Sequence, residues 1–128
     1  MNLMELFEDT SILKRNIASF KEYLKGKYPL TSLELFITNI GDLEIASIIV
    51  DKSHRKEHVG TNVINEISAF ADNNNLRIVL TPGIRDKHHG TTSRDRLVKF
   101  YKGFGFIANS GRNKDFTISN TLYRNPKR

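Results

Sequence analysis

The order of apolar and polar positions predicts a helix, a pair of strands, a helix, a strand, a helix and two last strands. Within residues 9–26, apolar side chains recur at the spacing of one helix face. An N-cap at Asp9, Thr10 or Ser11 and a stop at Gly26 bound this helix, which the pattern leaves either whole or broken in two.

A hairpin is predicted next, over residues 33–50 with the sequence "LELFITNIGDLEIASIIV". Two runs of β-branched and aromatic residues surround Asn39, Gly41 and Asp42, which are typical turn residues. The second run is longer and more apolar, so we expect it to be the more central strand.

The middle of the chain has the pattern of one crossover unit. A charged turn follows the hairpin, and a helical stripe of apolar residues then ends at "DNNN". The run "LRIVLT" predicts a strand, which Pro82 and Gly83 stop. Because a strand–helix–strand connection within one sheet joins parallel strands, residues 43–51 and 76–82 are predicted to pair in parallel.

The last third begins with a polar loop at residues 84–93, of the kind that often carries function in small domains. A helix is predicted from Thr92 or Ser93 to Gly103. Residues 104–124 then predict two strands joined by the turn-rich connection "NSGRNKD".

These elements indicate one domain, residues 1–128, of the α/β (α+β) class, with a mixed, mostly antiparallel sheet, a parallel central pair and flanking helices. Hydrophobic residues are 38% of the chain, no apolar run is long enough for a bilayer, and the acidic start does not resemble a secretory signal. We therefore expect a cytoplasmic protein. Zero cysteines exclude disulfides, thiolate metal ligands and a cysteine nucleophile.

The net charge of +6 is gathered in clusters, which favour polyanionic partners. Nucleic acid and a phosphorylated cofactor are both candidates, and a surface made basic for solubility is the simpler alternative. The clusters are Lys52, Arg55 and Lys56; Arg85 and Lys87; Arg94, Arg96, Lys99 and Lys102; and Arg124, Lys127 and Arg128.

The stretch "VDKSHRKEHVGTNVINEI", residues 50–67, resembles the pyrophosphate loop of the GNAT superfamily of N-acetyltransferases. That signature is Arg or Gln, two free positions, Gly, one free position, then Gly or Ala, and it maps onto Arg55, His58 and Gly60. The family has glycine where this chain has His58, and we expect this side chain to point outward.

A second stretch, "RLVKFYKGFGF" at residues 96–106, is similar to another hallmark of the family, a helix that ends in an aromatic pair before a Gly-Phe strand entry. The pair is Phe100 and Tyr101, and the entry is Gly105 and Phe106. The order of elements agrees from about residue 33 onward. Before that point the chain predicts a helix but no first strand.

The resemblance implies a site for acetyl-CoA between two strands that splay apart. In the family the pantetheine arm lies in that gap like an extra strand, which here implies the main chain of Ile49, Val50 and Asp51. The diphosphate would bind the N–H groups at the start of the following helix, with Arg55 at the rim. The other implied cofactor residues are Lys56, Glu57, His58, Val59, Gly60 and Thr61 in the loop, and Ser93 and Arg94 at the last helix.

The implied reaction is direct attack of an amine on the thioester, with main-chain N–H groups stabilising the oxyanion. Tyr101 matches the family's general acid, because a phenol with a pKa of about 10 delivers a proton readily to an alkyl thiolate. Glu44 is the candidate base by analogy, with Asp86 and Asp115 as loop alternatives. The acceptor is a small-molecule or protein amine, and a basic face would suit an acidic or nucleotide-containing one.

Two other functions stay open at this point: a small basic nucleic-acid-binding domain, and a GNAT-like protein that binds CoA without catalysis. The first is disfavoured because the helix aromatics lie on an apolar stripe, where no base can stack on them. The histidines His54, His58, His88 and His89 lack carboxylates at ligand spacing, so no metal site is predicted. No membrane partner is expected, and the oligomeric state is open, a homodimer included.

Overall fold

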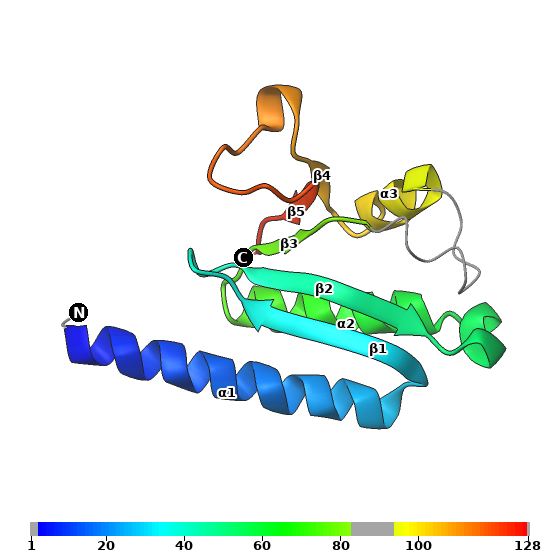
Figure 1. Ribbon diagram of the computed structural model, residues 1–128, viewed down its shortest axis with the longest axis horizontal. Helices are drawn as coiled ribbons and strands as arrows, with labels where there is room; N and C mark the ends of the chain where they lie inside the picture. The colour runs from blue at the N-terminus through cyan, green and yellow to red at the C-terminus, as the bar shows by residue number, and fades with distance from the viewer. Residues whose placement is uncertain (1–2, 83–93, 128) are drawn as a thin grey trace.

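The computed structural model describes residues 3–82 and 94–127, with the side chains of residues 3–10, 55, 56 and 94 outside that description. Three α-helices and a five-stranded mixed sheet of order β1-β2-β3-β5-β4 form an α+β fold, which confirms the predicted class (Figure 1). None of the described helices is long and apolar enough to cross a membrane. The elements are α1 (Leu3–Lys27), β1 (Leu30–Ile37), β2 (Leu43–Val50), η1 (Lys52–Glu57), α2 (Val59–Asn73), β3 (Ile78–Leu80), α3 (Arg94–Lys102), β4 (Ile107–Ala108), η3 (Gly111–Asn113) and β5 (Leu122–Arg124).

The first helix is unbroken and begins before the predicted caps at Asp9, Thr10 and Ser11, which therefore lie inside it. The caps were wrong because the preceding residues include good helix formers and no breaker, so the helix extends over them. Its apolar stripe buries Ile17 and Leu24 against the sheet.

The predicted hairpin is confirmed, with β1 and β2 antiparallel around a tight turn. The N–H of Thr38 donates to the carbonyl of Asp42 over 2.8 Å, and Gly41 takes a φ of +88°, which a residue with a Cβ rarely adopts. Both strands have eight residues, so the expectation that the second is longer was wrong. Its central place is confirmed, since β2 lies between β1 and β3.

The crossover through α2 is also confirmed, because β2 and β3 pair in parallel. However, β3 has three residues, fewer than the predicted 76–82. Before it, the N–H of Leu76 donates to the carbonyl of Ala71 over 2.8 Å and Asn75 has a φ of +54°. These residues close the end of α2, so they are not available to extend the strand.

The connection after β4 is longer than predicted. Residues 109–121 separate β4 from β5, so the run "DFTIS" is not a strand. The Asn109 side chain explains this, because its Oδ1 accepts the N–H of Asp115 over 2.6 Å and its Nδ2 donates to the carbonyl of Asn120 over 2.9 Å. A side chain that bonds local main chain competes with sheet pairing.

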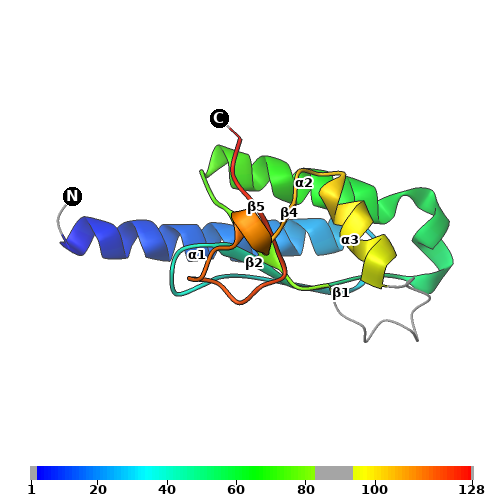
Figure 2. The ribbon, with the colours of Figure 1, turned by 90° about the horizontal axis from the view of Figure 1, so that it is seen from above.

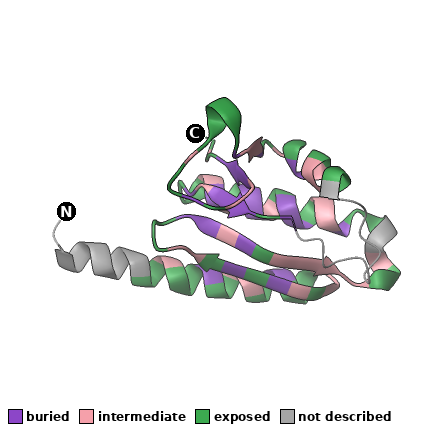
Figure 3. Cartoon of the chain, turned by 45° about the horizontal axis from the view of Figure 1, so that its top comes forward, coloured by how far each residue is buried: buried purple, intermediate pink, exposed green. Residues whose placement is uncertain are grey.

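The sheet has two different faces. On one face, α1 and α2 lie side by side and enclose the main core, which includes Leu33, Leu43, Ile64 and Ile78 (Figure 2). On the other face, residues 109–121 cover β3, β4 and β5 through a small cluster centred on Ile118. The β1–β2 half of this second face has no such cover in the part of the chain that the structure describes, and Figure 3 shows exposed positions alternating with buried ones there.

A buried arginine joins the C-terminal strand to α2. Arg124 donates through Nη1 to Asp72 over 2.8 Å, through Nη2 over 3.1 Å, and through Nε to the carbonyl of Phe104 over 3.0 Å. Its side chain is 4% exposed, so these bonds replace nearly all of its water. The pairing with Arg124 lowers the pKa of Asp72, which also accepts the N–H of Lys127.

We expect Asp72→Asn to destabilise the protein at neutral pH by about 2–3 kcal/mol, because Arg124 then stays buried without its counter-charge. Since the folded-state pKa of Asp72 is depressed, its contribution is present above the unfolded pKa near 4 and is lost as pH falls further. Urea denaturation should therefore show that wild type and variant differ less in free energy of unfolding at pH 3 than at pH 7. An equal difference at both pH values would contradict this.

Candidate functional site

The two parallel strands stay together over a short distance only. The pairs are Leu43 with Ile78, Glu44 with Val79, and Ile45 with Leu80, while β2 continues to Val50. Within residues 3–82 and 94–127, no strand pairs with this side of β2 beyond Ile45. Figure 1 shows β2 running on past the end of β3.

A bulge in β2 lies where this pairing stops. The register with β1 shifts between Glu34, opposite Ser47, and Leu35, opposite Ile45, which leaves Ala46 as the extra residue. Such a bulge reverses which alternate residues face each way along the strand. Before it, Leu43 and Ile45 face the main core; after it, Ile48 and Val50 pack against that core.

The main-chain groups of Ile48 and Val50 point toward the side that β3 has left. Leu43 shows the direction, since its N–H donates to the Arg77 carbonyl before β3 over 2.9 Å. In one strand, residues with side chains on the same face direct their N–H and C=O groups to the same edge. Ile48 and Val50 share the face of Leu43, so their groups point to an edge that no other strand of the described residues occupies.

Ile49 and Asp51, which the resemblance also implied, are placed differently. Ile49 has its side chain on the opposite face and lies opposite Ser32 of β1, so its main chain points toward that strand. The N–H of Asp51 donates to the Pro29 carbonyl and its own carbonyl accepts the N–H of His54, each over 2.9 Å. Ile48 was missed from sequence because the bulge that reorients it lies at Ala46, an unremarkable residue.

The turn after β2 is the short 3₁₀-helix η1, which leads directly into α2. His58 joins them in the left-handed conformation, with φ 58° and ψ 26°, and its side chain is exposed. The first bond of α2 runs from the N–H of Asn62 to the carbonyl of His58 over 3.1 Å. The N–H groups of Val59, Gly60 and Thr61 therefore precede the helical ladder, where the helix dipole is positive.

Gly60 brings α3 close to this helix start. A Cβ placed on Gly60 would lie 3.9 Å from Cζ of Phe100, which is ordinary van der Waals contact. The missing side chain of Gly60 thus leaves space between the two helices. Its backbone conformation is one that other residues can also adopt. Phe100 in turn packs edge-on against Tyr101, with ring centroids 5.2 Å apart.

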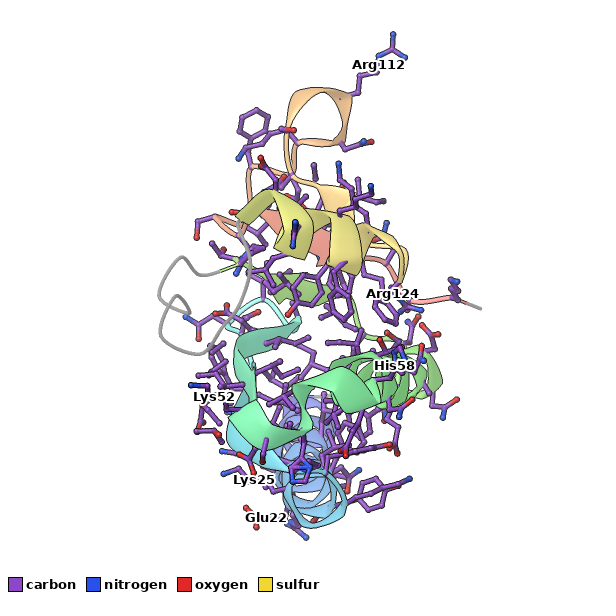
Figure 4. The ribbon with its side chains drawn as sticks, turned by 90° about the vertical axis from the view of Figure 1, so that its right-hand side faces the viewer. Glu22, Lys25, Lys52, His58, Arg112 and Arg124 are labelled. Atoms are coloured by element: carbon purple, nitrogen blue, oxygen red, sulfur yellow. The ribbon has the colours of Figure 1, made fainter. Side chains whose placement is uncertain are left out.

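The charged residues of the turn are only partly described. His54 Nδ1 and Glu57 Oε2 are 3.0 Å apart, so Glu57 faces a neighbouring side chain of the same turn. Figure 4 shows Lys52 and His58 on opposite sides of it. The side chains of Arg55, Lys56 and Arg94, and all of Ser93, lie outside the described residues.

Tyr101 belongs to the main core. It is 8% exposed, and its ring meets that of Phe106 edge-on at 5.5 Å. Its carbonyl accepts the N–H of Phe104 over 2.9 Å, which ends α3. The ring position is therefore set by packing on both sides, and this burial favours a positioned phenol over an aromatic at the helix surface.

The candidate bases differ in their surroundings. Glu44 lies on the sheet face away from the main core, between Phe36 and Val79, and is partly buried. Asp115 accepts bonds from Thr117 and from Arg77, and these lower its pKa to about 2. A carboxylate so stabilised in its charged form is a poor proton acceptor. Asp86 lies outside the described residues, as do His88 and His89.

No three His, Asp or Glu side chains in the described ranges gather as ligands for a metal ion. The carboxylates near the site instead have protein partners, such as Asp51, whose Oδ1 accepts the Thr31 hydroxyl over 2.5 Å.

We expect His58→Gly to be more stable than His58→Ala by about 1–2 kcal/mol, because alanine keeps the left-handed strain that glycine lacks. The two variants remove the same imidazole, so each is the control for the other. Thermal unfolding of both proteins measures the difference. Equal midpoints would show that His58 is not left-handed in solution.

Comparison with models of known protein families finds no match to this chain. A search of curated proteins finds no matching protein either.

Proposed function

We propose that this protein is an N-acetyltransferase that moves an acetyl group from acetyl-CoA to an amine. The observation that supports this best is the end of β2. There, the main-chain groups of Ile48 and Val50, which no strand within residues 3–82 and 94–127 pairs on that edge, lead within one short turn to the N–H groups that precede the helical ladder of α2. A ligand with an amide-bearing arm next to a diphosphate matches this order of donors and acceptors.

The two parts of the ligand have different partners in this proposal. The pantetheine amides bond the main chain of Ile48 and Val50 in place of the strand that β3 no longer supplies. The diphosphate accepts the N–H groups of Val59, Gly60 and Thr61, and the basic residues Arg55, Lys56 and Arg94 add positive charge by the family resemblance. Acetyl-CoA binds as a co-substrate. Because its pantetheine arm lies along Ile48 and Val50, its thioester lies near the point where β2 and β3 separate.

The chemistry needs one acid and one base. The amine nitrogen forms a bond to the acetyl carbon, the carbon–sulfur bond breaks, and the amine proton leaves to a base. Tyr101 donates its phenolic proton to the departing thiolate. Glu44 accepts the amine proton, directly or through water, whereas Asp115, whose pKa is lowered to about 2, is a poor proton acceptor. Glu44 lies one residue before Ile45, where the pairing of β2 with β3 ends, and Tyr101 lies in the main core on the opposite face of the sheet.

Gly60→Asp should weaken acetyl-CoA binding at least 10-fold, because a carboxylate at the helix start repels the diphosphate. Gly60→Ala is the matched control and should change the affinity less than 3-fold, since its Cβ meets Phe100 at an ordinary 3.9 Å. Isothermal titration measures both affinities. An acidic residue in the first turn also suits the helix dipole, so the variant should fold normally. Equal affinities for the two variants would show that the diphosphate does not bind at this helix start.

Tyr101→Phe should leave acetyl-CoA affinity nearly unchanged and lower kcat about 100-fold or more, because only the proton donor is removed. Thiol release from acetyl-CoA in the presence of a panel of primary amines measures turnover. An unchanged kcat would exclude Tyr101 as the acid. A wild-type protein that binds acetyl-CoA but releases no thiol with any amine would instead be a binding protein without catalysis.

A further inference from the structure

Residues 109–121 display an aromatic side chain to solvent. Phe116 is 88% exposed, far more than Phe36 and Tyr23, the other exposed aromatic residues among the described side chains, at 46% and 48%. Two cations on the same segment, Arg112 and Lys114, are also exposed. Figure 4 shows Arg112 at the outer tip of this segment, pointing away from the sheet.

The segment is held in place by its own bonds, so this exposure does not come from a loose chain. Besides the Asn109 contacts, the Tyr123 hydroxyl donates to the Asn113 carbonyl over 2.6 Å. Ile118 is 9% exposed and packs against Val79 and Tyr123 on the sheet. The main chain that carries Phe116 is thus already ordered in the free protein, so binding a ligand does not require the entropy loss of ordering it.

The local charge is positive. Asp115 is the acidic residue of the segment, and it is bonded to Arg77, which also pairs with Asp42 at 2.6 Å. Lys114 Nζ lies 5.8 Å from the Phe116 ring centroid, a cation–π arrangement that covers part of one ring face. The exposed residues Lys99 and Lys102 of α3 precede the segment in the chain.

We propose that this segment binds single-stranded nucleic acid. A base stacks on the open face of Phe116, and Arg112 and Lys114, which precede it in the chain, contact neighbouring phosphates. An exposed aromatic ring beside cations is the arrangement by which proteins hold unpaired strands. An acidic peptide offers carboxylates but no regular series of flat rings, and a duplex keeps its bases inside the stack. The core aromatics Phe100, which is partly buried, and Tyr101, which is buried, take no part, and the site does not depend on acyl transfer.

The test is fluorescence anisotropy of labelled twelve-nucleotide oligo(dT) and oligo(U) with the whole protein. Phe116→Ala should weaken binding about 5- to 150-fold, the range expected for one lost base stack. Phe116→Tyr should restore it, because the flat ring remains. Phe36→Ala, which removes an exposed aromatic of β1, is the control and should have little effect. Since Phe116 is 88% exposed, its variants should fold as wild type, which circular dichroism checks.

The charge contribution is measured separately through salt. Replacing Arg112 and Lys114 together by alanine should reduce the slope of log affinity against log salt by about 1.4, at 0.7 per lost phosphate contact. Heparin as competitor tests for general attraction to polyanions. If heparin binds equally well and Phe116→Ala has no effect, the proposal is overturned. Competition by acetyl-CoA would overturn it too, because the strand would then occupy the acyl site.

Discussion

The candidate site depends on the length of β3. Three residue pairs join it to β2, and β2 then runs on to Val50 without a partner on that side among the described residues. Main-chain N–H and C=O groups that are taken from water need partners, and a strand edge offers them in a row. Had β3 been as long as β2, Ile48 and Val50 would be bonded within the sheet and would have nothing to offer a ligand.

The bulge at Ala46 and the left-handed turn at His58 together set the main-chain direction between β2 and α2. The bulge directs the groups of Ile48 and Val50 to the open edge, and β2 then enters η1. The left-handed His58 ends η1 and allows α2 to begin at Val59. Each feature is local. Together they place the main-chain groups of Ile48 and Val50 shortly before the N–H groups at the start of α2. His58 keeps this left-handed conformation at the point where η1 ends and α2 begins.

Outside the candidate site, ion pairs and hydrogen bonds between side chains join separate elements of the fold. Arg124 and Asp72 tie the end of the sheet to α2, while Arg77 holds Asp42 and Asp115 together where the hairpin turn meets the 109–121 segment. The Tyr28 hydroxyl donates to Glu66 across α1 and α2, and this bond raises the pKa of Tyr28. These pairs engage Asp72, Asp42, Asp115 and Glu66, whereas other carboxylates such as Glu22 and Asp95 are exposed. The net charge of +6 suits both the proposed diphosphate site and the proposed nucleic-acid segment.

The sequence by itself determined the order of elements, the hairpin, the parallel crossover and the α+β class, because apolar spacing and turn residues act over a few positions. It also indicated Gly60 and the neighbouring loop, since a glycine at a helix start has a local signature. Only the tertiary structure decided that Ile48 and Val50, and not Ile49 and Asp51, face the open edge, because a bulge depends on a partner strand. The burial of Tyr101 and the exposure of Phe116 were likewise decided by contacts between distant segments, which no local pattern records.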